Sequence, residues 1–287
     1  MFRSLVAHLQ PVGPAAVQIT HGRQMQGEFF RRLDSIVASA AAILHGKRSE
    51  LRSYTLSQIQ GNFQPSQGQL HTQPHEHYWF RVTGIDALAH SAMDVLSQRC
   101  STWEVAGSRF EITGWEAIPS NHDSWAGELP LEHLLTVAHQ SMLAEPESIS
   151  LEFCSPTTFA QDKSAAWRRS RPLPDPPLVF RHIANHLDRA GTAIGRPENW
   201  EDLLENALRL QRFSIETQRR MFGNGSNYTG FTGICEFGIR PDLEPSDRLW
   251  LHMLAAVAFY TGVGEATAWG MGQVRRVPLA RFHYRGI

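Results

Sequence analysis

The sequence predicts an α+β fold divided into two successive halves. Segments with the apolar alternation of strands interchange with segments of helical apolar spacing along the 287 residues. A polar stretch with two prolines, residues 116–130, lies between the halves, and no short repeat of fixed period is present. At roughly 150 residues per domain, the length also fits two domains or one large one. We therefore place one domain at residues 1–122 and a second at residues 123–287.

The elements expected in the N-terminal half follow an order close to a ferredoxin-like unit. Met25, Phe29, Phe30 and Leu33 have helical spacing, and Ser35 is a suitable N-cap for a second helix. A turn-like QPHE segment inside an alternating run predicts a hairpin. In chain order, we expect a strand at 2–9, helices at 22–34 and 35–45, a strand at 52–59, the hairpin at 69–83, a helix at 86–99 and a strand at 108–115.

The C-terminal half shows the same mixture of strands and helices. Its most apolar segment, residues 247–260, predicts a buried helix that begins near Asp247. A glycine-rich turn at 223–230 separates two expected strands. In chain order, we expect a helix at 131–143, a strand at 148–154, a proline-rich loop at 170–177, a helix at 178–190, strands at 207–217 and 231–239, the helix at 247–260 and a last strand from Gln273.

Composition places the chain among ordinary globular proteins. Apolar residues make up 42% and charged residues 19%, which excludes a disordered chain. No run of 18 apolar residues is present, so no transmembrane helix is expected. The three scattered cysteines form no CxxC pair, which fits a reducing, cytoplasmic location.

Charge is segregated along the chain. Residues 1–52 carry a net charge of +4, residues 53–159 a net charge of −9 and residues 160–287 a net charge of +4. Of the 27 basic residues, all but Lys47 and Lys163 are arginine. Arginine grips phosphate with a planar fork and stacks on bases, although a GC-rich genome also favours arginine codons. The layout predicts a polyanionic partner that contacts both ends of the chain.

A glycine-rich loop near the C-terminus has the pattern GhGxxxxxGhG, where h is apolar. Such a loop lets backbone N–H groups approach a phosphate, and the alternative is a turn that leads into the last strand. The loop lacks the Gly-Lys-Ser/Thr end of a P-loop, and a dinucleotide fingerprint is excluded because Thr267 stands where its third glycine belongs. Its glycines are Gly262, Gly264, Gly270 and Gly272.

The position of this loop, directly after an apolar helix ending in AFYTGVG, is similar to the signature of the RAMP superfamily of CRISPR-associated proteins. The rest of the chain resembles the superfamily's precursor-crRNA-processing endoribonucleases, in order and over nearly the whole length. The segments that carry the resemblance are MQGEFFRRL, the dipeptide Leu44–His45, YTLSQIQG, LEFCSPTTF, RPLPDPPLVF and GFTGICEF. One departure is that the loop's inner residues, EATAW, contain no lysine or arginine.

This resemblance implies a fold and an activity. The fold is two tandem ferredoxin-like (RRM-like) domains. The activity is metal-independent cleavage of CRISPR repeat RNA, without a cofactor, in which a ribose 2′-OH attacks the adjacent phosphate and leaves 2′,3′-cyclic phosphate and 5′-OH ends. The expected partners are precursor crRNA, crRNA and other CRISPR-associated effector subunits. The alternative is a non-catalytic RAMP subunit that binds crRNA in an interference complex.

The resemblance also selects catalytic candidates. The reaction needs a base, an acid and a cation on the phosphorane, and fourteen histidines mean that composition alone selects none. His45 matches the family's Leu-His position, and Lys47, Arg48 and Arg52 follow it as a basic patch. Phe30 stands where some members have a tyrosine, so His21 or Tyr54 is the candidate for the second acid/base group.

Two further groups are candidates for RNA binding. Arg168, Arg169 and Arg171 combine charge with a neighbouring tryptophan before the proline-rich loop, although a plain surface loop is an equal alternative. Arg275 and Arg276 follow the glycine loop and could supply the charge that its inner residues lack. His182 and His186, four residues apart on an expected helix, lack the glutamate of HExxH, so we predict a partly exposed helix face and no metal site.

Overall fold

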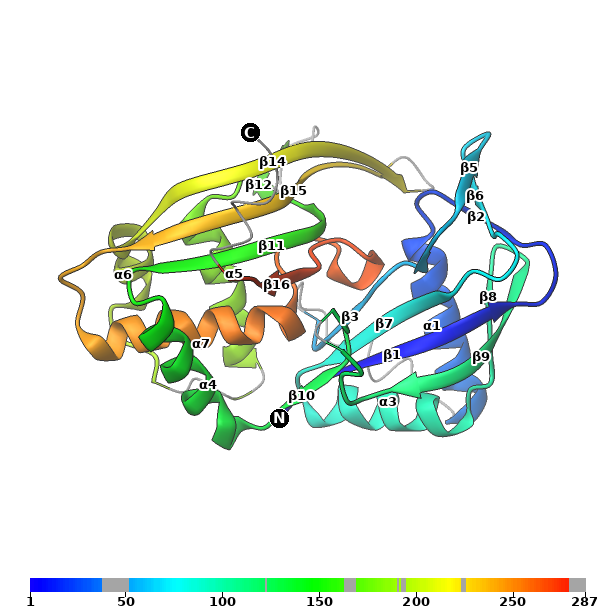
Figure 1. The fold of residues 1–287 in the computed structure, drawn as a ribbon, viewed down its shortest axis with the longest axis horizontal. Helices are drawn as coiled ribbons and strands as arrows, with labels where there is room; N and C mark the ends of the chain where they lie inside the picture. Colours follow the sequence, from blue (N-terminus) through cyan, green and yellow to red (C-terminus); the bar gives the residue numbers. More distant parts are fainter. Residues whose placement is uncertain are drawn as a thin grey trace. The chain divides into compact units, whose positions relative to one another are not determined.

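The structure is a computed structural model that describes residues 1–37, 52–121, 123–162, 169–189, 191, 195–222 and 226–278. The chain forms two compact units (Figure 1). The N-terminal unit comprises Met1–Leu129 together with Met221–Ser226 and Ala268–Gly270. The C-terminal unit comprises Pro130–Arg220, Asn227–Thr267 and Met271–Ile287.

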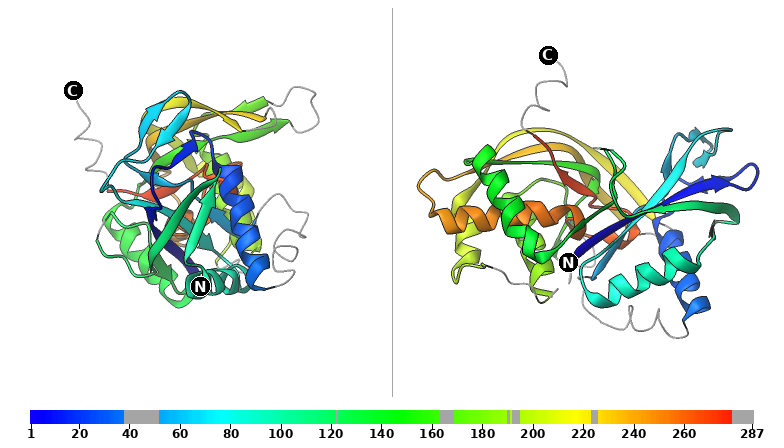
Figure 2. Two further views of the ribbon diagram at one scale, coloured as in Figure 1. Left: turned by 90° about the vertical axis from the view of Figure 1, so that its right-hand side faces the viewer. Right: turned by 60° about the horizontal axis from the view of Figure 1, so that its bottom comes forward.

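The N-terminal unit is an antiparallel sheet with two helices, α1 and α3, packed on one face (Figure 2). The sheet has the order β3-β7-β1-β9-β8, with β10 paired to β1 and β4 paired to β7. A smaller sheet has the order β2-β6-β5. The elements are β1 (Phe2–Pro11), β2 (Ala16–Gln18), α1 (Gly22–Ile36), β3 (Tyr54–Leu56), β4 (Gln60–Gly61), β5 (Gln64–Ser66), β6 (Gln69–His71), β7 (Tyr78–Gly84), α3 (Ala87–Arg99), β8 (Thr102–Val105), β9 (Ser108–Glu116) and β10 (Gly127–Leu129).

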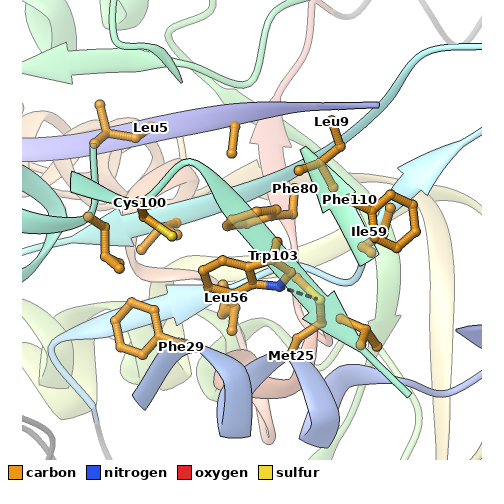
Figure 3. Packing of buried hydrophobic residues seen from close by; sticks show 14 of the residues in the cluster. Leu5, Leu9, Met25, Phe29, Leu56, Ile59, Phe80, Cys100, Trp103 and Phe110 are labelled. Carbon is orange, nitrogen blue, oxygen red and sulfur yellow. Dashed lines mark hydrogen bonds between the residues drawn. The ribbon is translucent and has the colours of Figure 1, made fainter. Parts of the chain in front are cut away.

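The core of this unit lies between its sheet and α1 (Figure 3). Met25, Phe29 and Leu33 are four residues apart on α1 and are at most 1% exposed, because this spacing puts them on one face of the helix. They pack against the sheet, where the Trp103 ring lies next to Phe80 with 4.3 Å between ring centroids. This packing fixes the position of α1, whose first turns carry the candidate site.

The C-terminal unit is a second antiparallel sheet, with the order β14-β15-β11-β16, that packs with helices. Helix α7 contacts α4, α5 and the strands β11 and β16. Phe180 of α5 meets Phe237 of β15 edge to face at 5.4 Å. The elements are α4 (Leu131–Ala144), β11 (Ser148–Thr157), β12 (Phe159–Asp162), β13 (Arg169–Arg171), α5 (Pro176–Arg189), α6 (Trp200–Ala207), β14 (Leu208–Phe222), β15 (Ser226–Ile239), α7 (Pro245–Thr261), the 3₁₀ turn η1 (Thr267–Trp269) and β16 (Val274–Arg276).

Both units have the ferredoxin-like topology. In the N-terminal unit, β1-α1-β3-β7-α3-β9 follow one another in the chain, and the sheet places the fourth of these strands beside the first. In the C-terminal unit, β11-α5-β14-β15-α7-β16 repeat this arrangement, and β16 pairs with β11. The expected α+β fold with two tandem ferredoxin-like domains is confirmed.

Most expected elements are present, and two local predictions are wrong. Ser35 is not an N-cap, because it lies inside α1 and its hydroxyl donates to the carbonyl of Arg32. Residues 69–83 do not form one hairpin: β6 pairs with β5 across a turn at Gln67–Gly68, and β7 pairs with β1 and β3. The elements β8, β10 and α6 were not predicted from the sequence, because they are short or lie in polar segments. No described helix is long and apolar enough to cross a membrane.

Candidate functional site

The predicted catalytic patch falls at the edge of the described structure. His45, Lys47 and Arg48 lie within residues 38–51, outside the described residues, and so does the helix expected at 35–45 beyond Val37. Arg52 is the first described residue after this segment and lies two residues before β3. Arg52 is therefore the member of this patch that lies within the described residues.

His21 is buried just before α1 and is held by the backbone on both sides of its ring. The amide N–H of Ile59 donates to Nε2 at 2.8 Å, so this nitrogen carries no proton. Nδ1 therefore carries the proton and donates to the carbonyl of Gln18 at 2.7 Å. Because the ring is fully shielded from solvent, this geometry favours a structural role for His21 and leaves neither nitrogen directed at a ligand.

Tyr54 lies at the start of β3, under the first turns of α1. Its ring stacks on Phe29 at 5.1 Å and meets Phe30 edge to face at 6.1 Å. Its hydroxyl oxygen accepts a hydrogen bond from Gln26 Nε2 at 2.8 Å and one from Arg52 Nη1 at 3.3 Å. Burial raises the pKa of the phenol, while the Arg52 charge and the two donors oppose this rise. Tyr54 is 2% exposed and therefore acts as a buried support for Arg52.

Trp269, in the glycine loop, contacts the same region of α1 within the N-terminal unit. Its indole Nε1 donates to Gln26 Oε1 at 2.8 Å, and the Arg23 guanidinium lies over its ring at 4.2 Å. The backbone approaches closely as well, because a Cβ added at Gly22 would stand 1.8 Å from the Trp269 carbonyl oxygen. The tip of the loop is thus packed onto the N-terminal end of α1.

The four loop glycines all have positive φ and lie against the chain's own backbone. A Cβ at Gly270 would meet the backbone nitrogen of Gln58 at 2.8 Å, and one at Gly272 would meet the carbonyl oxygen of Val263 at 2.1 Å. Gly264 approaches the Thr158 carbonyl in the same way, and Gly262 lies against Gly272. Glycine is therefore required here for close packing of the loop. A role of these glycines in phosphate binding stays a prediction.

Arg275 and Arg276 on β16 are both paired with carboxylates of the C-terminal unit. Arg275 Nε bonds Glu152 Oε2 at 2.8 Å across the strand pair. Arg276 Nη2 bonds Glu145 Oε2 at 3.1 Å, and its Nη1 donates to Nδ1 of the buried His252 at 3.0 Å. Burial lowers the pKa of Arg276, while Glu145 opposes this change. The predicted RNA contacts of both arginines remain untested, and their charge is already compensated within the unit.

The arginines before the proline-rich loop are only partly described. Arg168 lies outside the described residues, and for Arg169 only the backbone, in β13, is described. Arg171 is half exposed and pairs with Asp175 at 2.8 Å, just before α5. The predicted exposed helix face at His182 and His186 is wrong for His186, which is 1% exposed. Among the described residues, no three His, Cys, Asp or Glu side chains gather into a group that could hold a metal ion.

An exposed basic strand was missed by the sequence reasoning. β14 is the edge strand of the C-terminal sheet and carries exposed Arg209, Arg212 and Arg219 with an exposed aromatic, Phe213, at 58%. Arg212 lies 3.6 Å from Glu236, whereas Arg209 and Arg219 form no ion pair among the described residues. The sequence does show arginines within a strand of alternating apolar and polar residues. It does not show which strand lies at the edge of the C-terminal sheet.

The chain is similar to known proteins in sequence and in fold. Residues 151–274 match the family model of the CRISPR-associated endoribonuclease Cas6. A search of curated proteins found no match. A solved Cas6 product complex has 23% sequence identity and a TM-score of 0.73, over 96% of this chain and 99% of the other. Thermus thermophilus Cas6 has 24% identity and a TM-score of 0.66, over 96% and 98% of the two chains.

A third structure, described as a RAMP protein that binds different RNA substrates, has 14% identity and a TM-score of 0.62, over 96% of this chain and 100% of the other. These likenesses establish a common fold for both units. The sequence match lies within the C-terminal half, from the start of β11 to β16, and includes the glycine loop. The C-terminal half thus matches the Cas6 endoribonuclease family model, and both units share the fold of solved Cas6 and RAMP structures.

Proposed function

We propose that the protein is an endoribonuclease that binds CRISPR repeat RNA and cuts precursor crRNA by attack of a ribose 2′-OH on the adjacent phosphate. The observation that carries this proposal is the match of residues 151–274 to the Cas6 endoribonuclease family. Similar folds belong to a Cas6 product complex and a Cas6 substrate mimic complex, which supports RNA as the ligand. The products of the proposed reaction are a 2′,3′-cyclic phosphate and a 5′-OH.

In this proposal, His45 moves a proton and cations stabilise the phosphorane. His45 serves as general acid or base, since histidine is the side chain that ordinarily exchanges protons near neutral pH. Arg52, with Lys47 and Arg48 from the same segment, supplies positive charge where negative charge develops on the phosphate oxygens. The structures of similar fold include a Cas6 variant in which a histidine is replaced by alanine.

RNA binding is proposed to extend to the C-terminal unit through β14. Arg209 and Phe213 are four residues apart on a strand, so they point to the same face and could hold a phosphate and a stacked base together. Arg219 continues the exposed charge toward the end of the strand. This arrangement agrees with a polyanion that contacts both basic ends of the chain.

The deciding experiment incubates the protein with a panel of labelled repeat RNAs in EDTA. We expect one cut per repeat and a product end that resists ligation until the cyclic phosphate is removed. A 2′-deoxy nucleotide at the cut site should block cleavage, because the nucleophile is then missing. Cleavage of this 2′-deoxy RNA would reject the mechanism.

His45→Ala tests the proposed acid or base. We expect cleavage to slow by about two to four orders of magnitude, the range for losing a general acid or base. RNA affinity should change little, because a neutral imidazole attracts phosphate weakly. Binding of repeat RNA by the wild-type protein without any cleavage would instead support the alternative of a non-catalytic RAMP subunit, as the phenylalanine at position 30 also would.

A further inference from the structure

A continuous chain of hydrogen bonds links the glycine loop to Arg52 within the N-terminal unit. Trp269 Nε1 donates to Gln26 Oε1 at 2.8 Å, and Gln26 Nε2 donates to the Tyr54 hydroxyl oxygen at 2.8 Å. Arg52 Nη1 donates to the same oxygen at 3.3 Å. The series of hydrogen bonds thus runs from Trp269 in the loop through Gln26 of α1 and Tyr54 of β3 to Arg52.

The direction of each bond in this chain is fixed by Trp269. An indole nitrogen can only donate, so the Gln26 oxygen must face Trp269 and the Gln26 amino group must face Tyr54. The Tyr54 oxygen therefore accepts from Gln26, and the guanidinium of Arg52 can only donate to that oxygen. Without the indole N–H, the Gln26 amide could turn over and present its oxygen to Tyr54.

The chemical consequence concerns the charge on Arg52. A guanidinium that is held by a carboxylate is largely neutralised, as Arg275 is by Glu152 and Arg276 by Glu145. Arg52 is held by a neutral phenol whose proton is retained, because burial raises its pKa, and Arg52 forms no ion pair among the described residues. The arrangement orients a cation and leaves its charge available for a phosphate.

The loop tip is itself held firmly at both ends of Trp269. Gly22 lets the backbone of α1 approach the Trp269 carbonyl, and Gly270 lets the loop approach the Ser57–Gln58 backbone. Arg23 covers the indole ring at 4.2 Å, which adds a cation–π contact. The position of the indole N–H is therefore set by backbone packing on two sides.

We propose that Trp269 is a positioning residue for Arg52, acting through Gln26 and Tyr54, and that the tip of the glycine loop serves the reaction by orienting this arginine. The inference rests on the proposed function, since it assigns a role within the same cleavage. It goes beyond phosphate binding by the loop, because Trp269 contributes through an internal hydrogen-bond chain.

The first test is Trp269→Phe, which keeps one aromatic ring and removes the N–H together with part of the indole, a loss of ring atoms that the control below reproduces. We expect single-turnover cleavage of repeat RNA to slow about three- to tenfold, the effect of one neutral hydrogen bond, with RNA affinity unchanged within twofold. The matched control is Trp115→Phe, because the indole nitrogen of Trp115 is buried in the same unit and forms no hydrogen bond among the described residues. This control should cleave at the wild-type rate.

The second test combines Trp269→Phe with Arg52→Ala. If Trp269 acts through Arg52, the indole N–H has nothing left to orient once the guanidinium is removed. The double variant should then cleave no more slowly than Arg52→Ala alone, whereas a merely structural role would add its own loss. If the rate loss of the double variant equals the product of the two single-variant losses, the proposal is overturned. A wild-type cleavage rate in Trp269→Phe would overturn it as well.

The third test needs no RNA and follows the Tyr54 phenol directly. With ¹³C-labelled tyrosine, the Tyr54 signal is assigned by its absence in Tyr54→Phe, and its titration is then compared between the wild-type protein and Trp269→Phe. The Gln26 donor opposes the rise in the phenol's pKa, so loosening that donor should raise the pKa further, and an unchanged titration would contradict the link. Failure of the wild-type protein to cleave any repeat RNA would reject the proposed function, whereas normal cleavage by Trp269→Phe would reject only the positioning role.

Discussion

Arg52 in the N-terminal unit and Arg276 in the C-terminal unit are both partly shielded arginines beside a sheet, and their partners differ in charge. Arg52 donates to the neutral Tyr54 hydroxyl, whereas Arg276 pairs with the carboxylate of Glu145 and donates to His252. The two units share one topology, so the difference lies in the partner. An arginine whose partner is neutral keeps its charge for a ligand, and one whose partner is a carboxylate uses that charge to hold its own unit together.

Of the changes that test this comparison, replacement of Arg52 should have the largest effect, and the effect is on the cleavage rate. Arg52→Ala should slow cleavage about 100-fold, because a charge aimed at the developing phosphorane is lost, with little change in the free energy of unfolding. The measurement is single-turnover cleavage beside urea unfolding. Arg109→Ala, an exposed arginine on β9 of the same unit, is the control and should leave the rate unchanged. A rate loss of similar size in this control would show that only overall charge matters.

Arg276→Ala should instead reduce stability. Removal of the guanidinium takes one charged donor from the Glu145 carboxylate, which is 16% exposed, and one donor from the buried His252. We expect the free energy of unfolding to fall by about 2 kcal/mol, the range for a hydrogen bond to a charged group. Urea unfolding measures this change. Unaltered stability together with a large loss of RNA affinity would reverse the assignment and make Arg276 an RNA-binding residue.

The same cluster predicts a dependence of stability on pH. Burial, with the charges of Arg276 and Arg248, lowers the pKa of His252 to about 3. Because the unfolded chain binds this proton near pH 6.5 and the folded chain does not, stability is full above that pH and is lost as the pH falls toward 3. The stability lost between pH 7 and pH 5 is about 2 kcal/mol at most. His252→Gln keeps an acceptor for Arg276 without titrating, so its stability should vary less between pH 7 and pH 5, and an identical pH profile would contradict the assignment.

The fold was predicted well from the sequence because the apolar spacing that marks each helix lies within one short segment of the chain. Met25, Phe29 and Leu33 mark α1, and the apolar run at 247–260 marks α7, since each pattern records a buried face. The failed hairpin at 69–83 has a different cause, because strand pairing depends on contacts far along the chain. Tyr78 to Gly84 pair with β1 and β3, and no pattern within the segment itself encodes that choice.

The site was less accessible to sequence reasoning for the same reason. Arg52 was selected as part of the basic patch that follows His45, but its support by Gln26 and Trp269 joins residues 26 and 269, which are 243 positions apart. Arg275 and Arg276 were predicted to bind RNA, but Glu152 and Glu145 become their partners only after folding. Residue type identified the cations, and tertiary pairing decides which of them are available to RNA.

The smallest expected effect concerns the salt dependence of RNA binding. Arg209→Ala or Arg219→Ala should each reduce the slope of log Kd against log salt by about one, because each exposed guanidinium releases counterions from a phosphate that it neutralises. Arg275→Ala should alter the slope by less than half as much, since Glu152 already holds that charge at 2.8 Å. The measurement is RNA affinity across a salt series for the three variants. An equal change of slope in Arg275→Ala would mean that RNA displaces Glu152, and that carboxylate pairing in the free protein does not decide which arginines meet the RNA.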